Sequence, residues 1–339
     1  MKSVVTLPNW VGDTVLALPV LDALATTVRH LSVLGRRHLR PLLENRPGIA
    51  EFVVRADTNA ETIQALRDSS FDEAVILPNS YRSAWLAHRA GIAKRWGYGG
   101  WSPEGLLRRA ILAPPVRDHR ERGGHQVDDY VDLLSAMGVE VPAEWVPRID
   151  LSPQRNREGR DLLARSRLDQ SRSPLIGLFA GAEFGPSKRW PWRRFAELAQ
   201  QIRRHLPAGQ QIVLAGPKET WLAVRIHEES GMIHPVVGPD LDLGQLASVM
   251  AQMDLLVTND SGPMHLAAAL GVPCLAIFGP TDPRRTSPVG DAHRVLYTNR
   301  WCSPCFRRRC PLLRHRCMRD ITVDQATHQA LEMLASERP

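Results

Sequence analysis

The sequence predicts an α/β protein with two halves, each a parallel sheet covered by helices on both faces. Short apolar runs alternate with amphipathic helical stretches over residues 4–137, which is typical of a parallel sheet. A segment rich in Ser, Gln and Arg interrupts this alternation at residues 150–172. The alternation resumes at Leu175 and continues towards the C-terminus. We therefore expect two Rossmann-like domains that face a cleft, with the interruption as the crossing between them.

The individual elements follow from periodicity. In the first half we expect strands at 4–7, 31–34, 52–54 and 74–77, and helices at 14–27, 60–67, 80–89 and 128–137, the first bent by Pro19. In the second half we expect strands at 175–179, 211–215, 255–257 and 274–278, and helices at 192–205, 219–229, 243–252 and 323–335. The expected domains are 1–172 and 173–322, and the final segment, 323–339, is expected to pack back on the first domain.

Composition limits the classes of protein. The chain has 339 residues, of which 43% are hydrophobic and 23% charged, which suits a soluble protein of two domains. It has no apolar run long enough for a transmembrane helix, and residues 1–8 lack the apolar core of a secretory signal. We therefore expect a cytoplasmic protein. The net charge of +7 favours an acidic partner such as nucleic acid, an anionic membrane or a phosphorylated substrate, although a solvated basic surface would also account for it.

One segment, residues 254–283, concentrates polar residues at strand ends. It reads DLLVTNDSGPMHLAAALGVPCLAIFGPTDP. Asp260 or Ser261 can cap a helix that begins near Pro263, and free N–H groups at a helix start form an anion site. Neighbouring loops at the carboxyl edge of a sheet are where open α/β folds bind ligands. An ordinary strand–helix–strand unit without a ligand is the alternative, but the position of the polar residues favours a binding site.

The same segment resembles the nucleotide-sugar signature of the glycosyltransferase family 9 heptosyltransferases, which build the inner core of lipopolysaccharide. Three other places match that family: PNWVGD at 8–13, GAEFGPSKRWP at 181–191 and CSPC at 302–305. The matches extend from residue 4 to about residue 325 and are most similar to the heptosyltransferase II branch. The resemblance implies a glycosyltransferase B fold, in which the second domain holds the nucleotide.

Asp13 is the expected general base. It follows Gly12 in the first strand-to-helix turn, where its carboxylate can project from the sheet edge. Inverting sugar transfer needs a base that takes the proton of the attacking hydroxyl, and the resemblance implies that role here. The alternative is an acid that only interacts with the helix dipole. On the acceptor side, Gly12 would allow a close approach of the ligand, and Trp10 would either cover the cleft or pack.

Lys188 is the expected counter-charge for the leaving diphosphate. It lies in a loop after the strand at 175–179, and the resemblance implies a phosphate-contacting Lys there, although a loop Lys more often faces solvent. No Asp-x-Asp metal motif follows a strand. Positive side chains and helix N-termini would replace a metal, so we expect no required cofactor, and bound magnesium stays compatible with the sequence.

Other donor contacts are expected at the neighbouring strand ends. Ser261 and Gly262 offer backbone N–H groups to phosphate, whereas Asp260 suits sugar hydroxyls because a carboxylate would repel phosphate. The resemblance implies a phosphate contact for His265, and Glu219 suits the ribose hydroxyls. Weaker candidates for donor contacts are Glu183, Leu241, Thr281 and Asp282.

The cysteines fall into two groups. Cys274 lies in an apolar strand and is expected in the core. The other four, with the spacing C-x2-C-x4-C-x6-C, are Cys302, Cys305, Cys310 and Cys317. This spacing is close to zinc-ligand patterns, but a thiol cluster that packs or partly oxidises, or a redox or iron–sulfur site, would also fit. Stable disulfides are not expected in a reducing cytoplasm. We expect this cluster to fix the tail without taking part in catalysis.

The resemblance implies an inverting glycosyltransferase that moves heptose from ADP-heptose to heptosyl-Kdo-lipid A. Basic residues of the first domain would receive this anionic acceptor, with candidates Arg82, Lys94, Arg95, Arg120 and Arg122. The charge also suits peripheral contact with the anionic inner membrane. The alternatives are a transferase of another nucleotide-activated sugar, a nucleotide-sugar epimerase, or a nucleic-acid-binding protein with the tail as a zinc knuckle. The last leaves both α/β halves unexplained, so no nucleic-acid partner is expected.

Overall fold

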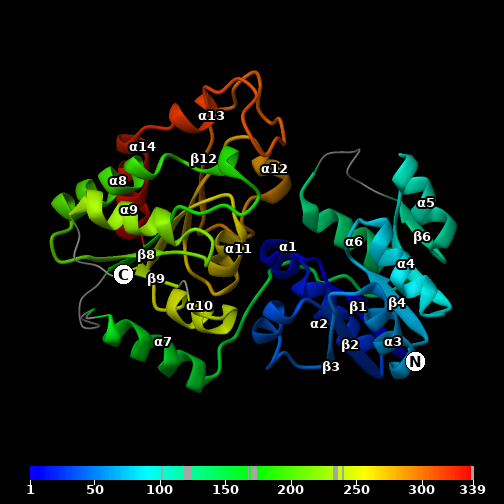
Figure 1. The fold of residues 1–339 in the computed structure, drawn as a ribbon. Helices are drawn as coiled ribbons and strands as arrows, with labels where there is room; N and C mark the ends of the chain where they lie inside the picture. The colour runs from blue at the N-terminus through cyan, green and yellow to red at the C-terminus, as the bar shows by residue number, and fades with distance from the viewer. Residues whose placement is uncertain are drawn as a thin grey trace. The chain divides into compact units, whose positions relative to one another are not determined.

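The computed structural model describes residues 1–100, 102–117, 124–166, 168, 174–231, 236–238 and 240–336. The chain divides into two compact units, Met1–Pro147 and Arg148–Pro339 (Figure 1). Each unit contains one parallel sheet with its own buried core. The predicted α/β class with two Rossmann-like units is therefore confirmed.

The first unit has a sheet of six strands in the order β3-β2-β1-β4-β5-β6 among its described residues. The strands are β1 (Lys2–Thr6), β2 (His30–Gly35), β3 (Ile49–Val54), β4 (Glu73–Ile76), β5 (Lys94–Gly99) and β6 (Pro115–Arg117). The helices are α1 (Val11–Leu16), α2 (Leu18–Thr27), the 3₁₀ helix η1 (Arg37–Leu42), α3 (Asn59–Ser69), α4 (Tyr81–Arg89), α5 (Pro103–Ile111) and α6 (Gln126–Met137). Central strands such as β1 are apolar because helices cover both of their faces.

Pro19 separates two helices instead of bending one. α1 ends at Leu16 and α2 begins at Leu18, with Ala17 between them. Pro19 falls in the first turn of α2, where its missing N–H would have had no helical partner. The single bent helix expected over 14–27 is therefore wrong, although the residues are helical.

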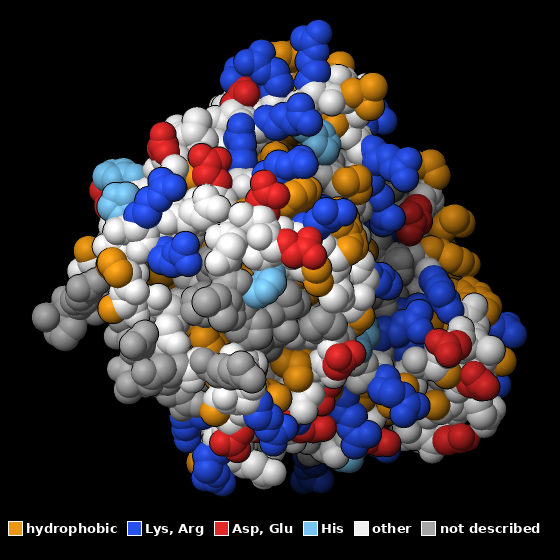
Figure 2. Space-filling view, turned by 60° about the vertical axis from the view of Figure 1, so that its left-hand side comes forward, with side chains coloured by type: hydrophobic (Ala, Val, Ile, Leu, Met, Phe, Trp, Pro, Cys, Tyr) orange, Lys and Arg blue, Asp and Glu red, His pale blue; other side chains and the backbone are white. Residues whose placement is uncertain are grey.

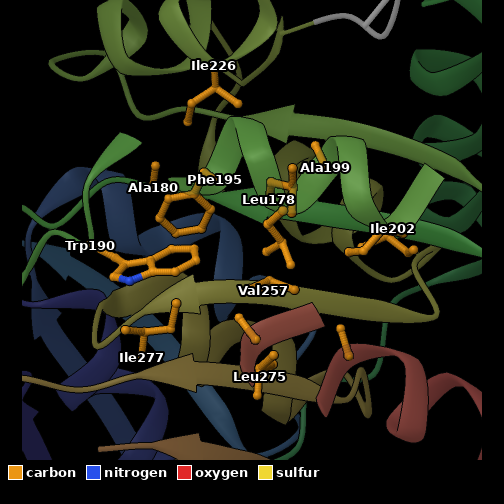
Figure 3. Close-up of a cluster of buried hydrophobic side chains, with 14 of the residues drawn as sticks. Leu178, Ala180, Trp190, Phe195, Ala199, Ile202, Ile226, Val257, Leu275 and Ile277 are labelled. Carbon is orange, nitrogen blue, oxygen red and sulfur yellow. The ribbon is translucent and has the colours of Figure 1, made fainter. Parts of the chain in front are cut away.

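The second unit repeats the architecture, with the strand order β12-β11-β10-β7-β8-β9. Its strands are β7 (Leu175–Phe179), β8 (Gln210–Leu214), β9 (Val236–Val237), β10 (Leu255–Asn259), β11 (Cys274–Ile277) and β12 (Arg294–Leu296). Its helices are α7 (Pro153–Arg165), the 3₁₀ helix η3 (Pro186–Lys188), α8 (Trp192–His205), α9 (Thr220–Ser230), α10 (Leu243–Met250), α11 (Gly262–Ala269), α12 (Pro283–Thr286), α13 (Arg316–Arg319) and α14 (Val323–Ser336). Figure 3 shows the core between this sheet and α8, with Trp190, Phe195 and Leu178 among its side chains.

Both sheets follow the strand order of the Rossmann fold. In each unit the chain builds outwards on one side of the first strand and then returns to build on the other side. The order reverses between β1 and β4 in the first sheet and between β7 and β10 in the second. Ligands of such folds bind at the carboxyl ends of the strands at this reversal. Each unit therefore has one topologically defined place for a site.

Two helices are attached differently from what the sequence suggested. The segment expected as the crossing between domains contains α7, which packs on α10, so the second unit already begins at Arg148 (Figure 1). The final helix, α14, packs on α8 and on the strands β10 and β11. Its face of Ala326, Ala330 and Met333 is buried in the core of the second unit. The expectation that it packs back on the first domain is therefore corrected.

Candidate functional site

The carboxyl edge of the second sheet brings together loops that are far apart in the sequence. β10 lies between β7 and β11, and β8 lies on the other side of β7. The residues after these four strands therefore meet at one edge: 180–191 after β7, 215–219 after β8, 260–261 after β10 and 278–282 after β11. The predicted donor residues come from these four loops or from the start of the helix that follows, with the exception of Leu241.

Asn259, the last residue of β10, holds both ends of the loop after β7. Its Nδ2 donates to the carbonyl oxygen of Ala180 at 2.7 Å, and its Oδ1 accepts from the backbone N–H of Trp190 at 2.9 Å. The Trp190 indole donates to Ile321 at 3.0 Å and packs edge-on against Phe195, with ring centroids 5.1 Å apart (Figure 3). Both ends of the loop after β7 are thus fixed by buried hydrogen bonds. From the sequence alone, Asn259 had no such role.

Lys188, Asp260 and Thr281 form one buried network at the strand reversal. The Nζ of Lys188 lies 2.5 Å from Oδ2 of Asp260, and Oγ1 of Thr281 donates to the same oxygen at 2.5 Å. The side chains of Lys188 and Asp260 are only 12% and 4% exposed, and Nζ also lies 5.0 Å from the ring centroid of Phe184. Asp260 therefore orients Lys188. Its predicted sugar contact stays a prediction.

Glu219 organises the same loop from the side of β8. Its Oε1 accepts from the backbone N–H of Ala182 at 2.9 Å and from Nη2 of Arg189 at 2.6 Å, and the residue is 7% exposed. Gly181 is needed for this approach because a Cβ there would lie 2.1 Å from Oε2 of Glu219. The predicted ribose acceptor is thus at the expected edge, where it also holds the loop in place.

The start of α11 lies beside this network. Ser261 is the N-cap and Gly262 the first helical residue, and N–H groups at this position have no carbonyl partner within the helix. Pro263 follows at the position where a missing N–H costs least. His265 is in the first turn and is 6% exposed. The predicted anion-binding helix start is therefore adjacent to Lys188, whereas the contact of His265 with phosphate remains a prediction.

The weaker donor candidates are engaged in local contacts. Glu183 pairs with Lys218 at 2.9 Å on the surface, and this contact raises the pKa of Lys218. Asp282 caps α12 and bonds to Arg284, which lowers the pKa of Asp282. Leu241 is half-buried directly before α10. Among these residues and Thr281, only Thr281 contacts the Lys188–Asp260 pair.

Asp13 lies at the strand reversal of the first sheet, in the first turn of α1. Trp10 is the N-cap and is 44% exposed, whereas Gly12 is buried. Two contacts fix the turn: Oγ1 of Thr14 donates to Pro8 at 3.1 Å, and Oη of Tyr130 donates to the carbonyl oxygen of Asp13 at 3.2 Å. These backbone contacts keep the Asp13 carboxylate at the carboxyl edge of the first sheet.

Arg55 adds a positive charge next to this turn that the sequence analysis missed. It follows β3 and is 6% exposed, and its Nη1 donates to Oδ1 of Asn9 at 3.0 Å. Its buried Nε has no hydrogen-bond partner among the described residues. Burial, and then the charges of Arg82 and Arg36, lower the pKa of Arg55. A buried guanidinium among like charges is prepared for an anion. In the sequence, Arg55 could have been recognised as a charged residue that directly follows a predicted strand.

The predicted basic acceptor residues separate into two groups. Arg82 lies in the first turn of α4 near Arg55 and donates to Oδ1 of Asn59 at 2.8 Å. Lys94 and Arg95 start β5 at the opposite, amino edge of the sheet, where Lys94 pairs with Glu73 at 2.9 Å and Arg95 bonds to carbonyl oxygens. They therefore lie away from the edge that carries Asp13, and their contact with the acceptor stays a prediction. Arg120 and Arg122 lie outside the described residues.

The cysteines are all free thiols. Cys274 is fully buried in β11, as predicted, and burial raises its pKa. Burial, together with the other three thiols of the tail, raises the pKa of Cys317 to about 11. No group of three or more His, Cys, Asp or Glu residues in the described part of the chain has the arrangement of a metal site. Among the described helices, none is both long and apolar enough to cross a membrane.

Comparison with known proteins identifies the family. Residues 60–315 match the model of glycosyltransferase family 9 (heptosyltransferase). The chain belongs to glycosyltransferase family 9. It is 32% identical to lipopolysaccharide heptosyltransferase 2 of Escherichia coli strain K12 over 314 residues, which cover 87% of this chain and 88% of that protein. It is 33% identical to the enzyme of the same name from Salmonella typhimurium, with the same coverage.

Solved structures support the same family and fold. The structure of E. coli ADP-heptose lps heptosyltransferase II is 28% identical, covers 99% of both chains and has a TM-score of 0.81. E. coli heptosyltransferase WaaC with ADP is 18% identical, with a TM-score of 0.74, and covers 98% of this chain and all of that one. The predicted glycosyltransferase B fold is therefore confirmed, and the chain is a glycosyltransferase.

Proposed function

We propose that this family 9 enzyme transfers heptose from ADP-heptose, with inversion, to a sugar hydroxyl of heptosyl-Kdo-lipid A in the lipopolysaccharide inner core. The relatives named lipopolysaccharide heptosyltransferase 2 support the substrate class. The observation that carries the proposal is the Lys188–Asp260–Thr281 network beside the start of α11. These groups offer a fixed ammonium and helix N–H groups to a diphosphate.

In the proposed reaction the acceptor oxygen attacks the anomeric carbon of the heptose. The bond between that carbon and the phosphate oxygen breaks, and ADP leaves with the electron pair. Lys188 and the N–H groups of Ser261 and Gly262 stabilise the charge that develops on the diphosphate. The carboxylate of Asp13 accepts the hydroxyl proton, as a general base. One displacement inverts the configuration.

The acceptor is anionic because it carries phosphates and the carboxylates of Kdo. Arg55 and Arg82 hydrogen-bond to the neutral side chains of Asn9 and Asn59, so their charge can meet an anion at the edge that carries Asp13. We therefore assign the acceptor to the first unit. Such a lipid-linked acceptor would place the reaction at the cytoplasmic face of the inner membrane.

No required metal is part of this proposal. The charge of the leaving group is met by Lys188 and by α11, so transfer is expected to continue after treatment with EDTA. A loss of activity in EDTA that magnesium restores would show that a divalent ion takes part.

The test is a transfer assay with heptosyl-Kdo-lipid A as acceptor and either ADP-heptose or a UDP-sugar as donor. Mass spectrometry detects the added heptose, and NMR of the product gives its anomeric configuration. We expect product from ADP-heptose with the configuration inverted. Transfer from the UDP-sugar would favour another sugar transferase, and an altered donor without any transfer would favour an epimerase.

A further inference from the structure

The segment of residues 300–320, called the basic segment below, differs in charge from the rest of the second unit. It contains seven arginines and a single acidic residue, Asp320. Almost all of the formal net charge of +7 therefore lies in this short stretch. The remainder of the chain is nearly neutral, so the basic segment dominates the long-range electrostatics of the protein.

The basic segment also exposes large hydrophobic side chains. Trp301 and Leu313 are each 88% exposed, Phe306 is 57% exposed and Leu312 is 47% exposed. Single exposed apolar residues are ordinary, but several in one segment mark an interaction surface. Figure 2 shows Lys and Arg side chains mixed with hydrophobic ones over the top of the view, the level at which Figure 1 draws the coil between β12 and α13.

Hydrogen bonds attach the basic segment to the loops that follow β7 and β11. The backbone N–H groups of Cys305 and Phe306 donate to Pro280 at 2.9 and 2.8 Å. The hydroxyl of Ser187 donates to Arg307, and the N–H of Ser187 donates to Arg308 at 3.2 Å. The exposed side chains are therefore presented from a fixed base.

The fold of the segment turns thiols inwards and large apolar groups outwards. Cys317 is buried and Cys302, Cys305 and Cys310 are half-buried. Phe306 and Leu313 have positive φ values of 53° and 55°, which are unfavourable for side chains of this size. Backbone strain of this kind persists where the surrounding structure imposes it, often at functional sites.

Several arginines of the segment keep their charge available. Arg307, Arg309 and Arg314 are exposed and form no ion pair within the described residues. Arg300 and Arg316 instead share the carboxylate of Asp320. Unpaired arginines next to exposed Trp, Phe and Leu match the chemistry of an anionic bilayer surface, where aromatic rings lie at the head groups and arginines bind lipid phosphates.

We propose that the basic segment docks the enzyme onto an anionic lipid bilayer, with Trp301, Phe306, Leu312 and Leu313 inserted at the interface and the unpaired arginines on lipid phosphates. This proposal is argued from residues 300–320 alone. It rests on the proposed function in one respect, which is that the acceptor is linked to a lipid. A bilayer uses both the apolar and the charged side chains. A single-stranded nucleic acid would stack on Trp301 and Phe306 but would leave Leu312 and Leu313 in solvent.

The test is co-sedimentation of the full-length protein with vesicles that contain no acceptor, made either of phosphatidylethanolamine with phosphatidylglycerol or of phosphatidylcholine alone. The variants are W301A/L313A and R309Q/R314Q. Their controls are L107A/W221A, which removes a Leu and a Trp that are 56% and 53% exposed elsewhere, and R203Q/R204Q on α8. Thermal unfolding of each variant, followed by circular dichroism, shows that it is folded.

We expect the wild type to bind anionic vesicles and to dissociate as salt rises. R309Q/R314Q should bind roughly 25-fold more weakly, from about five-fold for each arginine, W301A/L313A at least about ten-fold more weakly, and both controls within about two-fold of wild type. Equal binding by all variants, or no vesicle binding by the wild type, would overturn the proposal. So would a concentration-dependent dimer in analytical ultracentrifugation that W301A/L313A abolishes, because a second copy would then cover the surface. A failed transfer assay would leave this result unaffected.

Discussion

Lys188 shows how a single side chain is prepared for a ligand before the ligand arrives. A lysine in a loop is normally mobile and solvated, but this one is held by Asp260 and by the ring of Phe184. The lost rotamer freedom is thus a cost of folding and not of binding. The sequence could place Lys188 in the loop. It could not show that Asp260, far along the chain, would hold it.

The first prediction concerns this pair. Lys188→Met should weaken ADP binding by about 10- to 100-fold, since a charge-assisted hydrogen bond contributes about 1.5–3 kcal/mol. Isothermal titration calorimetry measures the affinity of each protein for ADP. Because K188M leaves the buried Asp260 carboxylate without its cationic partner, K188M/D260N is measured beside it to separate binding from folding. The control is Lys218→Met, whose side chain is 83% exposed in its own ion pair. Equal losses in K188M and K218M would contradict the role of Lys188.

A second prediction concerns Asn259. Asn259→Ala removes both bonds that fix the ends of the loop after β7, so it should destabilise the second unit by about 1–3 kcal/mol and weaken ADP binding. Asn259→Asp keeps the acceptor for Trp190 but places a buried carboxylate oxygen against the carbonyl oxygen of Ala180, so its effect should be at least as large. Thermal unfolding and calorimetry provide both readouts. Unchanged ADP affinity in N259A would show that the loop is held by other contacts.

The third prediction concerns the thiols of the tail. The pKa of about 11 leaves Cys317 almost entirely protonated at pH 8, where roughly one molecule in a thousand carries the thiolate. Alkylation with iodoacetamide, followed by mass spectrometry, should therefore modify Cys317 later than the half-buried Cys302 and Cys305. A zinc site would instead protect the four thiols together until a chelator is added. Simultaneous release by a chelator would favour the zinc interpretation.

At the scale of elements, apolar runs were sufficient to predict β1 to β4 of the first sheet but not β5 and β6. β5 reads KRWGYG, with charges and glycines and no apolar run. It is a strand because Glu73 of β4, which is 2% exposed, accepts from Nε1 of Trp96 at 2.8 Å and pairs with Lys94. These contacts depend on the neighbouring strand β4, so the sequence of β5 alone does not predict them.

The fourth prediction concerns the join between β11 and β12. Nδ1 of His293 accepts from the backbone N–H of Cys274 at 3.2 Å, which requires the neutral ring, and burial lowers the pKa of His293. Below about pH 6.5 the unfolded chain binds this proton more readily than the folded one. Stability should therefore fall as the pH drops from about 6.5 through the folded pKa. Thermal unfolding between pH 7.5 and 5.5 should show this fall, and His293→Gln should flatten it. An unchanged pH profile in H293Q would exclude His293 as the cause.

At the scale of the molecule, the sequence predicted two α/β units and the edges that carry their sites. It did so because the strand-end residues of parallel strands meet at one edge whatever the details of packing. It missed Arg55, whose burial depends on Asn9, and it misplaced the attachment of α14, whose apolar face fits either unit by periodicity alone. Contacts between distant segments decide such cases.

The central claim is that Asp13 of the first unit supplies the base while the second unit holds the donor. The most direct test compares wild type and Asp13→Asn in the transfer assay at saturating ADP-heptose and acceptor, with ADP affinity measured in parallel. The asparagine keeps the size and the backbone contact of Asp13 with Tyr130 but cannot take a proton. We predict that turnover falls by about 10²- to 10⁴-fold while ADP affinity stays within about two-fold. Turnover within about ten-fold of wild type would contradict the account.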